Sequence, residues 1–339
     1  NSPTMKIIIP MAGRGSRLRP HTLTVPKPLI PIAGKPIVHR LVQDIAKVTG
    51  DDIDEVAFII GDFGKEVESQ LIEIAESVGA KGSIYYQDEA LGTAHAILCA
   101  GDSLDGNVVV AFADTLFRTD FKIDRNSDGV IWVKQVDDPK AFGVVKMDEN
   151  NVITDFVEKP EEFVSDLAII GIYYFKDGAY LKSELQYLLD NNIKDKGEFQ
   201  LTNALENMKQ KGAQFLPGEV SDWMDCGNKD VTVETNSKIL NFLSDEGHGL
   251  IDPSATAENS EVIPPCFIGK NVVLKNAKIG PHVSVGNSCR IENSTISNTL
   301  IQEDTVIENA ELDNSMVGNK VHYRGGSKSI SIGDYSTLL

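Results

Sequence analysis

Hydrophobic and polar positions follow two different periods along residues 5–240. Short apolar runs have the length of buried strands, while segments such as 64–78 place apolar residues at helical spacing with charges between them. Strands that alternate with helices are typical of a mostly parallel, Rossmann-like α/β sheet covered on both faces. The pattern predicts strands at 7–9, 56–60, 84–86, 108–112, 130–136, 144–146 and 170–175, and helices at 36–48, 64–78, 93–101, 178–191 and 200–211.

A second pattern begins after a helix that we expect at 231–244. Six-residue repeats with an aliphatic head, three to a turn, predict a short left-handed parallel β-helix of about four turns. The repeat slips near Leu274 and Ile296, so an ordinary β-rich domain stays the alternative. We divide the chain into a catalytic domain at 5–240, a linker at 241–261 and a β-helix at 262–339. The recurring apolar positions are Ile268, Leu274, Ile279, Val285 and Ile291.

Charge is distributed very unevenly along the 339 residues, whose formal net charge is −18. Residues 1–43 contain no Asp or Glu but seven Lys or Arg. The acidic remainder argues against nucleic acid and anionic membranes as partners, whereas the acid-free opening favours a small polyanionic substrate. No apolar run reaches the roughly 18 to 20 residues of a membrane-spanning helix. Four dispersed cysteines indicate neither a zinc site nor disulfides, and we expect a cytoplasmic protein.

The stretch 6–36 combines a strand, two glycines and several cations. Gly13 and Gly15 allow the backbone N–H groups to approach a ligand, and arginine and lysine add charge-assisted bonds to phosphate. We therefore interpret it as a triphosphate cradle rather than a surface turn with incidental cations. A Walker loop is excluded because Pro36 follows Gly34-Lys35, and a dinucleotide fingerprint is excluded because Leu18 replaces its third glycine.

Two aspartates are candidate metal ligands. Asp114 directly follows the predicted strand 108–112 and Ala113, and Asp225 lies in the segment Asp222-Trp-Met-Asp-Cys-Gly227. Magnesium that bridges phosphate oxygens takes one or two carboxylates and keeps several waters. A helix N-cap or a turn is the alternative role for Asp114.

The order Gly-x-Gly-Ser-Arg-Leu-x-Pro-x-Thr-x4-Lys, from Gly13 to Lys27, resembles the signature of the sugar-nucleotide pyrophosphorylases. The resemblance extends over residues 5 to about 335 and is greatest to the long-form glucose-1-phosphate thymidylyltransferases with a hexapeptide-repeat tail. It implies that Asp114 and Asp225 hold Mg²⁺. The chain departs from the family at Ala12 and Ala113, where glycine is usual, and each extra methyl could narrow the pocket.

The resemblance also implies the substrate-binding residues. Residues 85–96 resemble the base-recognition loop, in which the Gln87 amide suits the edge of uracil or thymine. His95 is expected to be a packed helix residue. The nucleotide is assigned to Ala12, Gly13, Gly15, Ser16, Gln87, Gly92 and Thr93, and the sugar phosphate to Gly143, Glu158, Lys159 and Gly171.

We expect the phosphate of a hexose 1-phosphate to attack a nucleoside triphosphate, with catalysis by charge and position. Arg17 and Lys27 are assigned to the leaving pyrophosphate, and Lys159 to the incoming phosphate. Glucose 1-phosphate and dTTP are favoured, and the alternatives are a UTP-dependent enzyme for glucose or N-acetylglucosamine 1-phosphate and a mannose-1-phosphate guanylyltransferase. An inactive nucleotide sensor or scaffold is a further alternative.

The tail has its own alternatives. His282 and His322 are available for an acyltransferase, because six-residue β-helices often carry that chemistry. Four turns form a short groove for an acyl donor, so we prefer a role in homo-oligomer formation.

Overall fold

The computed structural model describes residues 4–50, 52–326 and 329–339. They form two compact units that do not follow the order of the sequence. Unit 1 comprises Asn1–Gly13 and Arg40–Trp223, and unit 2 comprises Arg14–His39 and Met224–Leu339. Residues 14–39, which we call the signature segment because they contain all of the signature after Gly13, thus belong to the same unit as the C-terminal residues. The domain boundaries drawn along the sequence remain a prediction, and the two units are described separately.

Unit 1 is built on one nine-stranded sheet in the order β10-β9-β11-β6-β1-β4-β5, with β8 beside β11 and β12 beside β8. The central strands β6, β1, β4 and β5 are parallel neighbours, whereas β11 is antiparallel to β6. The predicted α/β class is confirmed. The strands are β1 (Met5–Pro10), β4 (Ile53–Ile60), β5 (Lys81–Tyr86), β6 (Asn107–Ala111), β8 (Gly129–Gln135), β9 (Val144–Met147), β10 (Ile153–Val157), β11 (Leu167–Phe175) and β12 (Phe215–Glu219).

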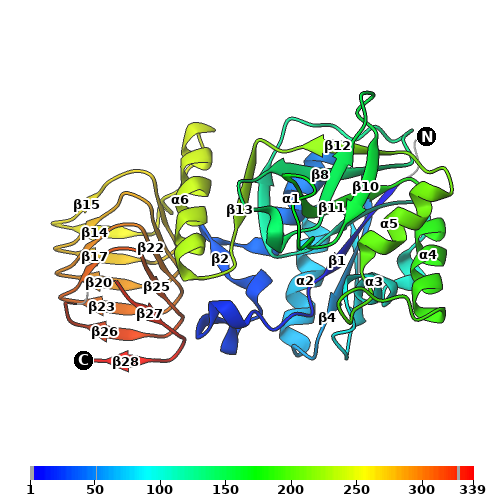
Figure 1. Ribbon diagram of the computed structural model, residues 1–339. Coiled ribbons are helices and arrows are strands. Elements are labelled where there is room, and N and C mark those ends of the chain that lie inside the picture. Colours follow the sequence, from blue (N-terminus) through cyan, green and yellow to red (C-terminus); the bar gives the residue numbers. More distant parts are fainter. Residues whose placement is uncertain (1–3, 51, 327–328) are drawn as a thin grey trace. The chain divides into compact units, whose positions relative to one another are not determined.

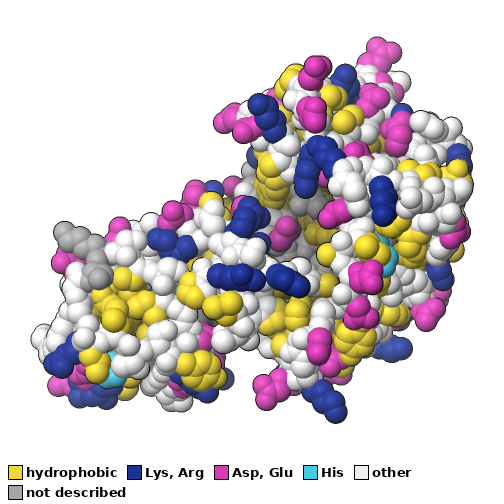
Figure 2. All heavy atoms as spheres, turned by 60° about the horizontal axis from the view of Figure 1, so that its bottom comes forward, with side chains coloured by type: hydrophobic (Ala, Val, Ile, Leu, Met, Phe, Trp, Pro, Cys, Tyr) yellow, Lys and Arg dark blue, Asp and Glu magenta, His cyan; other side chains and the backbone are white. Residues whose placement is uncertain are grey.

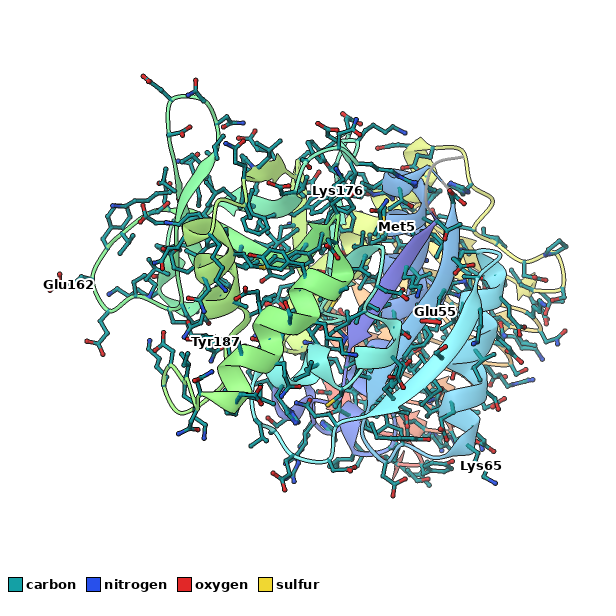
Figure 3. All side chains as sticks on the ribbon, turned by 90° about the vertical axis from the view of Figure 1, so that its right-hand side faces the viewer. Met5, Glu55, Lys65, Glu162, Lys176 and Tyr187 are labelled. Carbon is teal, nitrogen blue, oxygen red and sulfur yellow. The ribbon has the colours of Figure 1, made fainter. Side chains whose placement is uncertain are left out.

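Five helices accompany this sheet: α1 (Ile37–Thr49), α2 (Lys65–Ser77), α3 (Thr93–Leu98), α4 (Gly178–Asp190) and α5 (Leu201–Gln210). Helices α3, α4 and α5 pack together, while α2 packs on β4 and β5 (Figure 1). Asp177 caps the N-terminus of α4, because its side chain accepts a hydrogen bond from the Tyr180 backbone N–H at 3.1 Å. Figure 3 shows Met5 and Lys176 at one end of the sheet and Lys65, at the start of α2, at the other.

Unit 2 contains the predicted left-handed parallel β-helix, with three parallel sheets that contain six, four and five strands. Helix α6 (Lys229–Asp245) packs on β19, β22 and β25 (Figure 1). The first sheet is β14 (Thr256–Glu258), β17 (Val273–Lys275), β20 (Arg290–Glu292), β23 (Val306–Glu308), β26 (His322–Arg324) and β28 (Thr337–Leu338). The second is β15 (Glu261–Val262), β18 (Lys278–Ile279), β21 (Thr295–Ile296) and β24 (Glu311–Leu312); the third is β16 (Cys266–Ile268), β19 (Val283–Val285), β22 (Thr299–Ile301), β25 (Ser315–Val317) and β27 (Ser331–Ile332).

The spacing between coils explains why the six-residue repeat slips. Leu274 pairs with Ile291, Ile291 with Ile307 and Ile307 with Tyr323, so successive coils are 17, 16 and 16 residues long. Three full repeats would need 18 residues, so the coil of 17 has one spacing of five residues instead of six, and each coil of 16 has two. Shorter coils, and a start at Thr256 before the predicted 262, give more levels than the four turns that we expected.

One corner of the β-helix is lined by asparagines in the left-handed backbone region, which Asn tolerates better than most residues. Their side-chain amides form a ladder with N···O distances of 2.7, 3.2 and 3.3 Å. Each coil is therefore linked to the next by a side-chain bond in addition to its backbone ladder. The residues are Asn259, Asn276, Asn293 and Asn309.

Candidate active site

In unit 1 the predicted nucleotide loop and Asp114 lie at one edge of the sheet. Strands β1 and β6 are parallel neighbours, and residues 11–13 follow the first while residues 112–114 follow the second. The carboxyl ends of parallel strands meet at the same edge, where ligands of α/β sheets bind. A Cβ on Gly13 would meet no atom within 4 Å, so packing does not require glycine there. An open backbone suits the approach of a ligand.

Gly171 interrupts β11 beside this edge. Its φ is +98°, and the pairing of β11 with β8 shifts register between Ile169 and Tyr173. The Gly171 carbonyl accepts a hydrogen bond from the Phe112 backbone N–H at 3.0 Å. This bend therefore lies against the segment that leads to Asp114.

Two candidate site carboxylates influence the buried Tyr173. Burial raises the pKa of its hydroxyl, and the negative charges of Glu158 and Asp114 raise it further. Glu158 accepts a hydrogen bond from Thr202 at 3.3 Å, and burial raises the pKa of its carboxyl against the influence of Lys159. Unit 1 thus brings Asp114 and Glu158 into electrostatic contact with one buried ring.

Gly143 and Lys159 lie on either side of Glu158. A Cβ on Gly143 would stand 3.1 Å from Glu158 Oε2, so a side chain there would press on the carboxylate. Lys159 is exposed, has a positive φ of 39° and accepts a hydrogen bond from the Lys196 ammonium through its carbonyl. The neighbouring loop, which carries Glu162, projects away from the sheet (Figure 3).

The base-recognition loop is fixed by contacts that the sequence did not predict. Gln87 Nε2 lies 3.0 Å from His95 Nδ1, so the amide donates and the histidine carries its proton on Nε2. Burial lowers the pKa of His95, which favours this neutral form. His95 was expected only to pack in its helix, and its spacing of eight residues from Gln87 carries no signal of the contact.

Gly92 and Thr93 are held from the other side by the start of α5. The φ of Gly92 is +112°, and a Cβ there would lie 2.3 Å from the Phe199 carbonyl oxygen. Thr93 Oγ1 accepts a hydrogen bond from the Leu201 backbone N–H at 2.9 Å. Only glycine fits the backbone at position 92.

In unit 2, the signature segment closes on itself. Thr22 Oγ1 donates a hydrogen bond to the Gly15 carbonyl at 2.6 Å, and a Cβ on Gly15 would lie 3.1 Å from that of the buried Lys27. The segment contains three short 3-10 helices, Ser16–Leu18, His21–Leu23 and Lys27–Leu29. The local backbone therefore brings Gly15 and Lys27 of the predicted cradle together.

Gly227 lies beside two further predicted site residues of unit 2. A Cβ at this position would stand 3.0 Å from Asp225 Oδ2 and 3.2 Å from Arg17 Nη2. A carboxylate and a guanidinium that are more than 200 residues apart in sequence thus line the same glycine. Five of the predicted site residues belong to unit 2, and all other predicted site residues belong to unit 1. The five are Gly15, Ser16, Arg17, Lys27 and Asp225.

The grouping and the exposure of the candidate metal ligands show what kind of metal site they fit. Within residues 4–50, 52–326 and 329–339, no three His, Cys, Asp or Glu side chains are grouped so as to hold a metal by themselves. Asp114 and Asp225 are each exposed. Single exposed carboxylates fit Mg²⁺, which takes the rest of its shell from water and substrate phosphate, and do not fit a protein-enclosed ion.

Acidic side chains are spread over the face shown in Figure 2, in keeping with the overall negative charge. No helix among the described residues is long and apolar enough to cross a membrane.

Comparisons with known proteins agree with the predicted resemblance. The nucleotidyl transferase family model matches residues 6–241. The chain is 29% identical to a glucose-1-phosphate thymidylyltransferase of Streptomyces antibioticus over 94% of its own length and 93% of the relative's. It is 28% identical to the bifunctional protein GlmU of Methanococcus maripaludis, over 89% and 77% of the two lengths. A Bacillus anthracis structure described as a glucose-1-phosphate thymidylyltransferase with sucrose aligns with a TM-score of 0.58 and 26% identity, over 69% of this chain and 95% of that one.

Proposed function

The chain belongs to the nucleotidyl transferase family and is a sugar-1-phosphate nucleotidyltransferase; from this premise we propose that it joins glucose 1-phosphate to dTTP. The products are dTDP-glucose and pyrophosphate. The observation that carries the proposal is the Gln87–His95 contact of 3.0 Å, which orients an amide suited to a pyrimidine. The similarity to a thymidylyltransferase over nearly the whole chain supports the choice of substrates.

The proposed reaction needs no protein nucleophile. A phosphate oxygen of glucose 1-phosphate forms a bond to the α-phosphorus of the triphosphate, while the bond from that phosphorus to the bridging oxygen of the β-phosphate breaks. Pyrophosphate leaves with the bonding electrons. Because the attacking oxygen is already anionic at neutral pH, the protein contributes position and charge stabilisation.

We assign the positive charge for this reaction to arginine, lysine and Mg²⁺. Arg17 and Lys27 bind the leaving pyrophosphate, because guanidinium and ammonium groups form charge-assisted bonds to phosphate oxygens. Lys159, exposed on its loop, binds the phosphate of the sugar. Asp114 and Asp225 are the carboxylates that would hold Mg²⁺, which would supply charge to offset the repulsion between the two phosphate compounds.

Gln87 selects the base in this proposal. With Nε2 directed at His95, its Oε1 stays available to accept the N3–H of thymine or uracil. Glu158, held by Thr202, accepts hydrogen bonds from hydroxyl groups of the sugar. UTP is the second candidate triphosphate, because this edge is the same in uracil and thymine.

The substrate assignment is tested by pyrophosphate release with Mg²⁺, for dTTP and UTP against a panel of four sugar 1-phosphates. We expect the highest kcat/KM for dTTP with glucose 1-phosphate. Gln87→Ala should lower the preference for pyrimidine over purine triphosphates, whereas Gln186→Ala, an exposed helix residue bonded to Asp190, should not. Preference for UTP would transfer the proposal to the uridylyl reaction, and absence of turnover with every pair would refute it in favour of a nucleotide sensor.

For the β-helix we propose a structural, oligomer-forming role rather than an acyltransferase. His282 Nε2 lies 2.8 Å from Asn241 Oδ1, and His322 Nε2 lies 3.0 Å from Glu308 Oε2. Both candidate histidines thus have structural partners. Light scattering of the full chain should show more than one copy, and transfer of an acetyl group from acetyl-CoA to a sugar phosphate would contradict this role.

A further inference from the structure

The signature segment, residues 14–39, is attached to the last coil of the β-helix. His21 is 5% exposed, and its Nε2 lies 3.0 Å from Ser331 Oγ. Three residues further on, Thr24 donates a side-chain hydrogen bond to Asp334. The two pairs join residues that are 310 positions apart in the sequence.

Backbone packing reinforces these polar contacts. A Cβ on Gly333 would stand 3.1 Å from Pro20 Cβ and 3.5 Å from the Pro20 carbonyl oxygen. Gly333 therefore lets the segment approach the coil more closely than any other residue would. Ser331, Gly333 and Asp334 form one short support for residues 20–24.

The other end of the segment is attached to earlier coils. The hairpin of β2 (Pro31–Ile32) and β3 (Lys35–Pro36) turns at Ala33 and Gly34. The Ala33 N–H donates to Asn236 Oδ1 at 2.9 Å, and Ser284 Oγ donates to the same fully buried oxygen atom at 2.7 Å.

A Cβ on Gly34 would be 2.2 Å from the ring of Phe267. Phe267, Ser284 and Ser331 belong to β16, β19 and β27, which are strands of one sheet. That sheet, together with Asn236 of α6, therefore holds the segment at both ends.

Arg17 and Lys27 are four residues before His21 and three residues after Thr24. Consecutive Cα atoms are about 3.8 Å apart, so a shift of residues 21–24 is passed on to both cations. The bond from Thr22 to the Gly15 carbonyl links the supported part to the glycine turn as well.

We infer that Ser331, Gly333 and Asp334 are positioning residues for nucleotide binding: the last coil of the β-helix sets the place of the segment that binds pyrophosphate. The inference rests on the proposed function for the role of Arg17 and Lys27. It gives the β-helix a part in the reaction although none of these three residues touches substrate. Misplacement of a binding group by about 1 Å can cost on the order of 100-fold in rate.

The experiment compares Gly333→Leu with Gly249→Leu in the full chain. Gly249 is the matched control, because a Cβ there meets nothing within 4 Å and its φ is not positive. Binding of dTTP with Mg²⁺ is measured by titration calorimetry, and KM and kcat by pyrophosphate release. We expect Gly333→Leu to weaken dTTP binding about tenfold or more, and to raise KM for dTTP more than KM for glucose 1-phosphate, while Gly249→Leu matches the wild type.

Trypsin gives a readout that does not depend on activity. Arg14 and Arg17 are exposed, and cleavage after them should be faster in Gly333→Leu than in Gly249→Leu if the segment is released. Equal cleavage and unchanged dTTP binding would overturn the inference. An inactive wild type would refute the proposed function instead, and trypsin would still decide whether the coil holds the segment.

A double-mutant cycle covers the case in which Gly333→Leu fails to fold. His21→Ala and Ser331→Ala each remove one partner of the same contact. Their effects on dTTP affinity should be less than additive, because the second change removes a contact that is already lost. Additive effects would overturn the inference.

Discussion

Units 1 and 2 hold their candidate substrate groups by different means. In unit 1 the groups follow the ends of neighbouring strands in a sheet whose core is fully buried, as at Ile8 and Val110. In unit 2 they lie on an irregular segment of 3-10 turns, fixed by polar contacts to a β-helix. Backbone geometry therefore sets the positions of the groups in unit 1, whereas residues very distant in sequence set the positions of those in unit 2.

Removing the charge of Arg17 is the strongest test of the role given to unit 2. Arg17→Ala should reduce kcat by about 100-fold or more, because a preorganised donor to developing charge contributes that much elsewhere. Arg290→Ala, whose guanidinium pairs with Glu292 on the β-helix surface, should leave kcat unchanged. Steady-state pyrophosphate release measures both. Near-normal turnover of Arg17→Ala would refute the role assigned to Arg17.

For unit 1 the sharpest change is a single methyl at Gly92. Gly92→Ala should lower the free energy of unfolding by about 2 kcal/mol or more, because the new Cβ would overlap the Phe199 carbonyl in addition to straining φ. Gly64→Ala isolates the strain, because Gly64 has φ 88° and ψ 164° against 112° and 174° at Gly92, and nothing lies within 4 Å of its Cβ. Urea unfolding distinguishes them, and equal losses would show that the close approach does not matter.

Glu158 tests whether a carboxylate in unit 1 recognises sugar. Glu158→Gln should raise KM for glucose 1-phosphate about tenfold, because a hydrogen bond to a charged acceptor is worth about 1.5 kcal/mol or more. Glu162→Gln, on the loop that projects from the sheet in Figure 3, is the control.

The pH dependence of this KM sharpens the assignment. Burial raises the pKa of Glu158, so its carboxylate gains a proton at a higher pH than an ordinary glutamate does. KM should therefore rise as pH falls through that raised pKa in the wild type. Glu158→Gln removes the group, and a variant with the same pH profile as the wild type would contradict the role.

The smallest effect concerns His21 and the stability of the protein at acidic pH. Burial lowers the pKa of His21 from 6.5 to about 4, despite the attraction of Asp334. In the unfolded chain His21 binds a proton near pH 6.5, whereas in the folded chain it does so only near pH 4. Its contribution to the free energy of unfolding is therefore complete above pH 6.5 and is lost as the pH falls toward 4. Between pH 6.5 and 5.5 the loss should be about 1 kcal/mol. Urea midpoints of the wild type and His21→Asn should diverge over this range, and parallel curves would show that His21 titrates normally.

The fold of both units could be predicted because burial imposes a period on the sequence. Strand β12 was not predicted, because it contains Pro217 and Gly218, which are uncommon inside strands. It tolerates both residues because it lies at the edge of the sheet and pairs with β8. The length of a coil was also not predicted, because one or two corners that are each one residue shorter look like noise in a six-residue repeat. The pattern specifies which face is apolar and leaves corner length open.

For the candidate site, the sequence supplied the chemical groups and omitted what positions them. Gln87 was predicted but its partner His95 was not, and nothing near His21 points to Ser331. Such contacts join side chains whose types are common on any surface. Their specificity comes from three-dimensional placement, which periodicity does not encode.

The 310-residue separation between His21 and Ser331 has a consequence for biosynthesis. A ribosome makes His21, in the segment proposed to bind pyrophosphate, 310 residues before it makes Ser331 in the support of that segment. We expect a nascent chain to complete the sheet of unit 1 early and to gain affinity for nucleotide only after residue 334 has left the exit tunnel. Polypeptides released prematurely would then withdraw no triphosphate from the cell.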